Sequence, residues 1–311
     1  MKIKLLSALT FAALALSLPR VQAEAFNQLK VSSDTKWLVH VDLEGFRGTQ
    51  VGKFVDETLL GPHREKLQAD IKRELGFELD WNQVKSLTAF GNDYEIKPES
   101  AGLLMLKTDT KLQTNFKQLL ESKIESGFGP VTIQPIKSKL DNLYAIAGEL
   151  FVALEPDGLF LFGKTRGQVE GAKATLTASQ TPLNQSEAFA SYPTLPNTMV
   201  FLAVADAFGD FAKIPPQAQV LKMSKGARIA LCETDEKILL QAELKTPDAK
   251  SSRQILAVIQ GMVTLAMLSG GDERIVEIAE AINVSTRDAI VTMKLELPID
   301  RALGTLKRFA Q

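Results

Sequence analysis

The sequence predicts an α+β protein built from two tandem related units, each of which is an antiparallel sheet with helices packed on one face. Three observations support this prediction. Short apolar runs with a period of two alternate with longer segments of helical period. Neighbouring strand-like runs are close enough in sequence to form hairpins, and two short patterns recur along the chain. Strands and helices mixed in this way are typical of the α+β class.

The recurring patterns mark a strand and a junction between a strand and a helix. Trp-Leu-Val-His-Val-Asp at residues 37–42 aligns with Phe-Leu-Ala-Val-Ala-Asp at residues 201–206. Leu-Lys-Thr ends an apolar run at Thr108 and again at Thr246. Both copies of the tripeptide are followed by an aspartate that we expect to cap a helix, namely Asp109 and Asp248.

In the first unit, strands are expected where apolar residues alternate, and helices where they recur every three or four positions. The expected strands are residues 37–43, 85–90, 102–107, 131–136, 143–147, 151–155 and 159–162. The expected helices are residues 49–60, 62–75, 110–126 and 168–178. Gly127, Gly129 and Pro130 end the third of these helices, because glycine and proline disfavour its continuation.

The second unit repeats the order of strand, irregular or helical stretch, two strands, helix and strand. The expected strands are residues 199–205, 227–233, 237–245 and 289–297, and the expected helices are residues 249–268, 272–282 and 300–310. Three prolines among serine, threonine, asparagine and glutamine mark a linker between the units. The predicted division is therefore a first α+β unit at 24–178, a linker at 179–198 and a second α+β unit at 199–311.

One local segment carries a resemblance to known proteins. Residues 80–91 read Asp-Trp-Asn-Gln-Val-Lys-Ser-Leu-Thr-Ala-Phe-Gly, a short turn that leads into a strand ending on glycine. In this segment and in its tandem arrangement, the chain resembles exported bacterial proteins of unknown function that are built from tandem α+β units. The resemblance spans most of the mature chain, and it implies a fold but no activity.

Residues 1–23 have the features of a cleaved export signal. Two lysines precede an apolar run at residues 5–18, and small residues precede the cleavage site expected between Ala23 and Glu24. The run is shorter than the roughly 20 apolar residues that cross a bilayer core. We therefore expect a mature chain without a transmembrane span, located in the periplasm or secreted.

Composition argues against several classes of function. The 36 basic and 37 acidic residues leave a net charge of −1, which is not the charge balance of a general nucleic-acid-binding protein. Cys232 is the only cysteine, and its apolar surroundings predict a buried small side chain rather than a nucleophile. The sequence contains no C-x-x-C, H-E-x-x-H, G-x-S-x-G or dinucleotide motif, so we predict no cofactor, no metal and no catalytic residue.

Two constellations resemble functional sites. Residues 158–165 fit the phosphate-loop pattern G-x-x-x-x-G-K-[ST], but their Leu-Phe-Leu-Phe core reads as one strand of a hairpin rather than a free loop. His40, Asp42 and Glu44 fall on one face of a strand, with fewer ligands than a zinc site needs. We interpret these three residues as a solvated face or a strand-end cap.

The third feature is the segment at residues 255–268, which is apolar on almost every side as a helix. Such a helix is normally buried or paired, so we expect it to form core shared between the two sheets. The alternative is a methionine-bearing surface that binds a second subunit, a partner or an apolar ligand. The candidate contact residues are Ile259, Met262, Val263 and Met267.

These observations favour an exported, non-catalytic binding or scaffold protein of the bacterial cell envelope that acts through protein–protein contacts. Its partner is an unknown envelope protein or a second copy of the chain. Two alternatives remain open. One is a carrier of an apolar small molecule in a pocket between the units, and the other is an envelope hydrolase that uses scattered carboxylates.

Overall fold

The computed structural model describes residues 26–75, 80–94, 102–126, 132–137, 142–177, 180–186, 189, 192, 198–206, 224–234, 236–268 and 273–309. The predicted signal peptide at 1–23, its cleavage site and part of the predicted linker lie outside the described residues. So does the glycine and proline stop expected after the helix at 110–126.

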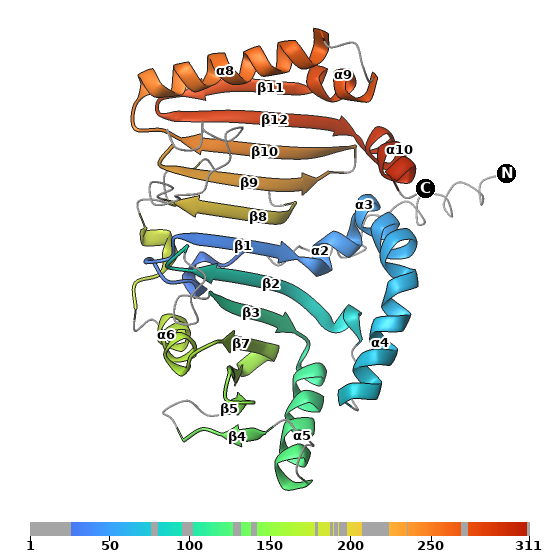
Figure 1. Ribbon diagram of the computed structural model, residues 1–311, viewed down its shortest axis with the longest axis vertical. Coiled ribbons are helices and arrows are strands. Elements are labelled where there is room, and N and C mark those ends of the chain that lie inside the picture. Colours follow the sequence, from blue (N-terminus) through green and yellow to red (C-terminus); the bar gives the residue numbers. More distant parts are fainter. Residues whose placement is uncertain are drawn as a thin grey trace, which may run out of the picture.

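Twelve strands form one continuous sheet that runs the length of the molecule (Figure 1). Every neighbouring pair is antiparallel, so the predicted α+β class with antiparallel pairing is confirmed. The spatial order is β11-β12-β10-β9-β8-β1-β2-β3-β7-β6-β5-β4. The strands are β1 (Trp37–Asp42), β2 (Val84–Gly91), β3 (Leu103–Thr108), β4 (Ile133–Pro135), β5 (Leu143–Ile146), β6 (Leu150–Glu155), β7 (Leu159–Gly163), β8 (Met199–Asp206), β9 (Gly226–Glu233), β10 (Lys237–Lys245), β11 (Ile282–Arg287) and β12 (Ile290–Pro298).

The two separate sheets expected from the sequence are joined into one. Strands β1 and β8 pair side by side, with Trp37 opposite Ala205 and Val41 opposite Phe201. Both strands carry apolar residues on both faces, and an unpaired edge would leave their backbone groups without partners. Pairing the two edges satisfies these groups. We call this junction the seam.

On either side of the seam, the strands follow the same order. The first half runs outward as β1, β2, β3, β7 and β6, and the second half runs outward as β8, β9, β10, β12 and β11. In both halves a helix follows the third strand, and the fourth strand in space comes from later in the chain. The tandem duplication itself stays a prediction, and the seam shows where the two halves meet.

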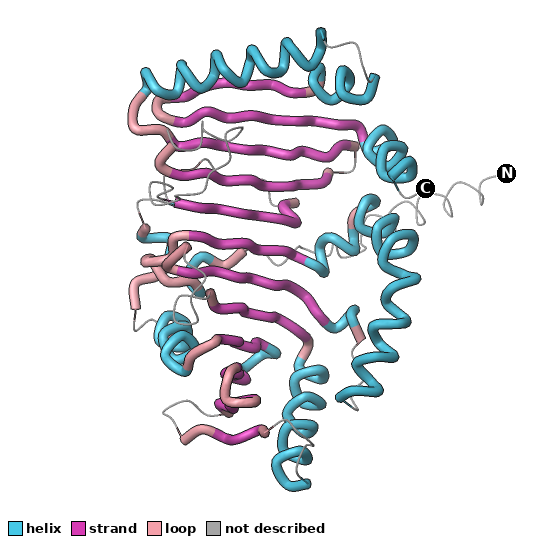
Figure 2. Tube along the Cα trace, viewed as in Figure 1, coloured by secondary structure: helices cyan, strands magenta, loops and turns pink. Residues whose placement is uncertain are grey.

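Figure 2 shows helices along one edge of the sheet and at the ends of the strands. They are α2 (Leu43–Gly48), α3 (Gln50–Phe54), α4 (Gly61–Leu75), α5 (Thr110–Ser126), α6 (Arg166–Leu176), α8 (Ala249–Leu268), α9 (Glu273–Glu280) and α10 (Ile299–Phe309), with the short helical turns η1 (Gln28–Lys30), η2 (Val55–Leu60), η3 (Trp81–Gln83), η4 (Pro156–Gly158) and η5 (Leu183–Gln185).

Helices pack on two faces of the sheet rather than on one. Val169 of α6 joins the core cluster of Leu38 and Met105 on one side, which we call the covered face. Leu120 of α5 joins a second cluster with Phe160 on the other side. The reason is that strands such as β3 and β7 are apolar at successive positions, so both faces need to be buried there.

The predicted junctions between strand and helix are confirmed, and they match in detail. The amide of Leu112 donates to Asp109 Oδ1 at 2.7 Å, and the amide of Ser251 donates to Asp248 Oδ1 at 2.7 Å. Each preceding threonine is buried, and its hydroxyl donates to the carbonyl of a residue next to a later strand. Thr108 Oγ1 donates to the carbonyl of Gly158 at 3.1 Å, and Thr246 Oγ1 donates to the carbonyl of Ala289 at 2.9 Å.

The sequence analysis missed strand β11. The helix expected at 272–282 is α9, which ends at Glu280, and Ile282 then begins a strand that pairs with β12. The hairpin turns at Asp288, whose φ is 52° without a glycine to signal it.

Candidate functional site

Helix α8 lies along β11 at one end of the sheet (Figure 1). Its inward side is anchored by Ile255, which is 1% exposed, and by Ser252, whose hydroxyl donates to the carbonyl of Asp288 at 2.8 Å. These contacts explain why the helix starts where it does and which side faces the sheet.

The outward side of α8 is apolar and open to solvent. The exposed fractions are 53% for Val258, 51% for Met262, 68% for Leu265 and 76% for Leu268. Neighbouring helix α9 adds two more exposed apolar side chains, Ile275 and Ile278. We call these six residues the α8–α9 surface. A soluble monomer rarely presents such a continuous apolar surface without a partner.

The core interpretation of this helix is therefore wrong, since only Ser252 and Ile255 are buried in it. The helix lies at an outer edge because the two halves meet at the seam and not around α8. Among the four candidate contact residues, Met262 and Met267 are exposed, while Ile259 and Val263 are half-buried. Three of the most exposed residues, Val258, Leu265 and Leu268, were missed by the sequence analysis, and their spacing of seven and three residues was the available signal.

One helix in the described part of the chain, α8, is also long and apolar enough by length and composition to cross a membrane. Only 11% of its most apolar window is buried.

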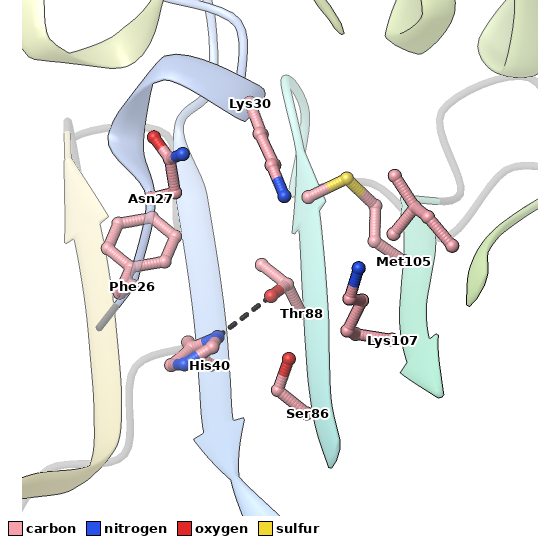
Figure 3. Close-up of a pocket in the computed structure, with 9 residues that line it drawn as sticks. Phe26, Asn27, Lys30, His40, Ser86, Thr88, Met105 and Lys107 are labelled. Carbon is pink, nitrogen blue, oxygen red and sulfur yellow. Dashed lines mark hydrogen bonds between the residues drawn. The ribbon is translucent and has the colours of Figure 1, made fainter. Parts of the chain in front are cut away.

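A second group of polar side chains lies on the covered face, where Phe26, Asn27 and Lys30 line a pocket together with residues of β1, β2 and β3 (Figure 3). His40 is 3% exposed, and its Nδ1 is 2.8 Å from Thr88 Oγ1. Phe26 covers the imidazole with a ring-to-ring distance of 5.2 Å. Burial lowers the pKa of His40 to about 4, so the ring is neutral at pH 7.

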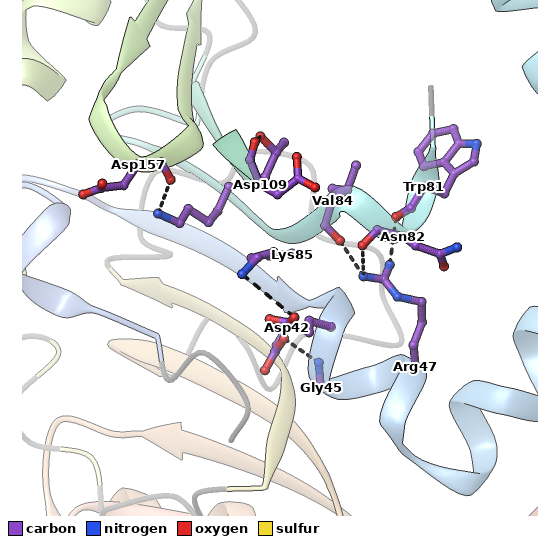
Figure 4. Close-up of polar contacts among 12 residues, drawn as sticks. Asp42, Gly45, Arg47, Trp81, Asn82, Val84, Lys85, Asp109 and Asp157 are labelled. Carbon is purple, nitrogen blue, oxygen red and sulfur yellow. Dashed lines mark hydrogen bonds and ion pairs between the residues drawn. The ribbon is translucent and has the colours of Figure 1, made fainter. Parts of the chain in front are cut away.

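The interpretation of His40 and Asp42 as a solvated face is wrong, because the two side chains are only 3% and 1% exposed. The cap interpretation is confirmed for Asp42, whose Oδ1 accepts from the Gly45 amide at 2.8 Å (Figure 4). Glu44 points elsewhere and pairs with Lys85 at 4.0 Å. Among the described residues, no group of three or more histidine, cysteine, aspartate or glutamate side chains could hold a metal ion.

The segment at 80–91 has a structural explanation. Arg47 of α2 donates to the carbonyls of Trp81, Asn82 and Val84 at 3.1, 3.4 and 2.6 Å (Figure 4). These bonds hold the turn against α2 and fix the entry into β2. The segment is therefore a tertiary contact of the fold, and no ligand is needed to explain it.

Residues 158–165 form no phosphate cradle. Residues 159–163 are strand β7, paired with β6 in the predicted hairpin. The amides of Lys164 and Thr165 both donate to Gln168 Oε1, at 2.8 and 3.0 Å, within a capping box at the start of α6. Amides that are already bonded to a side chain are not available to phosphate oxygens.

Two further buried side chains, Cys232 and Arg228, lie in strand β9. Cys232 is fully buried as predicted, and burial raises its pKa to about 11. Arg228 pairs with Glu243 beneath the ring of Tyr192, whose centroid is 4.8 Å from the guanidinium carbon. Gln241 donates to the second oxygen of Glu243 at 3.1 Å, so this cluster is a buried ion pair with its own partners.

The fold and the surface together describe an α+β protein with one long antiparallel sheet and an exposed apolar helix at its edge. No known family model matches the chain, and no curated protein matches its sequence. Among solved structures, the chain is similar to crystal forms IV, III and I of the treponemal protein TP0453, with TM-scores of 0.45, 0.44 and 0.42. The alignments cover 91% of this chain and 97%, 98% and 97% of those chains, at 10%, 9% and 10% sequence identity. Similarity at this level assigns no role to any residue, and the function is argued from the chain itself.

Proposed function

We propose that the protein is an exported, non-catalytic binding protein of the bacterial cell envelope, and that it binds an amphipathic helix of a partner protein through the α8–α9 surface. The observation that carries the proposal is the row of apolar side chains on the outward side of α8, each more than half exposed. Export is supported by the signal-like pattern of residues 1–23.

The spacing of the exposed residues favours a helical partner. Val258, Met262, Leu265 and Leu268 follow one another at intervals of four, three and three residues. On a helix these intervals place the side chains in one stripe, which is the arrangement that packs into the grooves of a second helix.

The chemistry of α8 requires the partner to be apolar. No ionisable side chain occurs from Gln254 to Leu268, so the helix offers no charge to steer a polar partner. Complete burial of a leucine or methionine side chain stabilises by about 1.5–3 kcal/mol. Each of these four side chains is already partly covered, so burying its exposed part would contribute about 1 kcal/mol to the binding free energy.

Site-specific photocrosslinking tests the proposal. A photoreactive amino acid is placed at Leu265 of α8 and, as a matched control, at Gln118, which is exposed on α5. We expect a discrete protein adduct at position 265, none at position 118, and loss of the adduct when Met262→Glu is added. Equal labelling at both positions, or an adduct that survives Met262→Glu, would overturn the proposal.

A second candidate occupant is a lipid bilayer, because α8 alone among the described helices has the length and hydropathy of a membrane span. Binding to vesicles of phosphatidylethanolamine and phosphatidylglycerol distinguishes a bilayer from a partner protein as the occupant. Flotation of the purified mature chain with vesicles, abolished by Met262→Glu, would favour the bilayer over a protein helix. The carrier and hydrolase alternatives stay predictions, and a carrier pocket would have to lie away from the seam, where β1 and β8 are hydrogen-bonded.

A further inference from the structure

The polar pocket on the covered face has an unusual charge balance. Its nine lining residues are Phe26, Asn27, Lys30, His40, Ser86, Thr88, Met105, Lys107 and Leu159. They include two lysines, two hydroxyls, one amide and one imidazole, and none of them carries a carboxylate. The ammonium groups of Lys30 and Lys107 both point into the space above Thr88, from opposite sides of the pocket (Figure 3).

Two cations that converge in this way attract an anion. Like charges that face each other at a partly buried site repel, and an oxyanion placed between them would reverse the sign of both interactions. Lys107 donates one hydrogen bond to the carbonyl of Asp157, which fixes the lysine but does not neutralise it. An ammonium has three donors, so this lysine keeps capacity for a ligand.

The imidazole of His40 provides an independent reason to place a ligand here. The side chain is 3% exposed, and its Nε2 is buried with no hydrogen-bond partner. Its other nitrogen is already held by Thr88, at 2.8 Å. Buried polar atoms normally have a partner, and an orphaned nitrogen beside a cavity is the arrangement that a bound polar molecule completes.

The size of the pocket limits the ligand. The cavity is about 30 Å³, and a water molecule needs roughly 10–15 Å³ by the same measure. The space therefore holds two or three non-hydrogen atoms, which suits a carboxylate group better than a phosphate. The carboxylate alone fills this space. Phe26, Met105 and Leu159 supply an apolar wall along which the short apolar part of the ligand would extend toward the open side of the pocket.

We propose that this pocket binds the carboxylate of a small organic acid, with Lys30 and Lys107 supplying the charge and Ser86 supplying a hydroxyl donor, while Thr88 stays bonded to His40 Nδ1. This inference is independent of the α8–α9 surface, which lies at the far end of the second half.

Histidine-selective NMR tests the proposal with acetate as the probe. The chain has two histidines, His40 and His63, so labelled imidazoles report on the pocket with an internal reference. Sodium acetate, titrated at pH 7 against a constant ionic strength, should shift the His40 signals saturably and leave those of His63 unchanged. The neutral analogue acetamide should produce no saturable shift.

Charge-removing variants locate the binding. Lys30→Met should weaken acetate binding at least tenfold, whereas Lys164→Met, the same change at an exposed site outside the pocket, should have no effect. Lys30→Gln is a second variant in case the methionine disturbs folding, which circular dichroism would show. Absence of a saturable His40 shift, an equal shift with acetamide or chloride, or binding that both Lys30 variants leave unchanged would each overturn the proposal.

Discussion

Helices α5 and α8 hold the same place in the chain order of the two halves, but their outward sides are opposite in character. Each follows the third strand of its half and begins at an aspartate cap. On α5, the exposed residues that the structure describes are all polar; they are Thr110, Lys111, Thr114, Asn115, Gln118, Glu121, Ser122 and Glu125. On α8, the exposed residues include Val258, Met262, Leu265, Met267 and Leu268.

This contrast separates what the fold requires from what it does not. Both helices bury an apolar inward side, represented by Leu120 of α5 and Ile255 of α8. The polar outward side of α5 shows that a helix at this point in the chain order of a half can have a hydrophilic outward side. The exposed apolar residues of α8 are therefore not needed for folding, and they are the strongest reason to assign α8 a binding role.

The largest expected effect is on the free energy of unfolding, when the buried inward sides of α5 and α8 are truncated. Leu120→Ala and Ile255→Ala should each lower the free energy of unfolding by about 3 kcal/mol, because each removes fully buried methyl groups and leaves a cavity. Chemical denaturation measures both values. Leu265→Ala is the control and should change stability by less than about 0.5 kcal/mol, since this side chain is 68% exposed. A loss at Leu265 as large as that at Ile255 would mean that α8 is structural on both sides.

The second prediction concerns the central strands, where β1 carries His40 and the facing residue of β8 is Leu202. The pKa of His40 is lowered from about 6.5 to about 4, so between these values the unfolded chain binds a proton that the folded chain does not. The contribution is complete above pH 6.5 and declines as the pH falls, by about 2 kcal/mol at pH 5. Denaturation at pH 7 and pH 5 should show this loss relative to His40→Leu. Parallel pH dependence in the two proteins would show that His40 titrates normally.

The third prediction tests whether the two junctions are energetically alike. Thr108→Val and Thr246→Val keep the shape of the side chain and remove buried hydroxyls, each of which donates to a carbonyl next to a later strand. Each substitution should cost about 1 kcal/mol, and the two costs should be equal within error. A large loss at only one threonine would show that the halves share a sequence pattern but not its role.

The smallest effect is expected when the outward side of α5 is made apolar. Lys117→Leu combined with Glu121→Leu removes an ion pair of 3.8 Å and should change stability by less than about 0.5 kcal/mol. This variant should also gain no adduct when a photoreactive residue is placed at Gln118. If this α5 variant captured the same partner as α8, the binding would be nonspecific association with exposed leucine side chains. The difference between the two helices would then be no evidence of a specific binding role for α8.

The sequence predicted well those elements whose periodicity is long and whose ends are capped. The observed bounds of α5, α8 and β10 are the predicted ones, because helical spacing and the caps Asp109 and Asp248 define them locally. Strand β11 was missed because Ile282 and Val284 are its only apolar side chains of any size, and an edge strand needs no more.

The predictions of which residues are buried failed for a different reason than the prediction of β11. The sequence of α8 is that of a buried helix, and only the pairing of β1 with β8 places this helix at an edge. Likewise, His40 and Asp42 have the alternation of a solvated strand, but both are buried, and Phe26 lies against the imidazole. Pairing between segments some 160 residues apart leaves no local pattern, so neither the seam nor the pocket around His40 could be read from the sequence.

The seam has a consequence for how separated halves would behave. Because β1 meets β8 in antiparallel orientation, the contact has a local two-fold axis, and two identical strands could form it equally well. A chain divided within the region between α6 and β8 would give two fragments, each with an open apolar edge strand. Such fragments would recombine with one another or self-associate, in the manner of domain swapping, rather than remain as independent monomers.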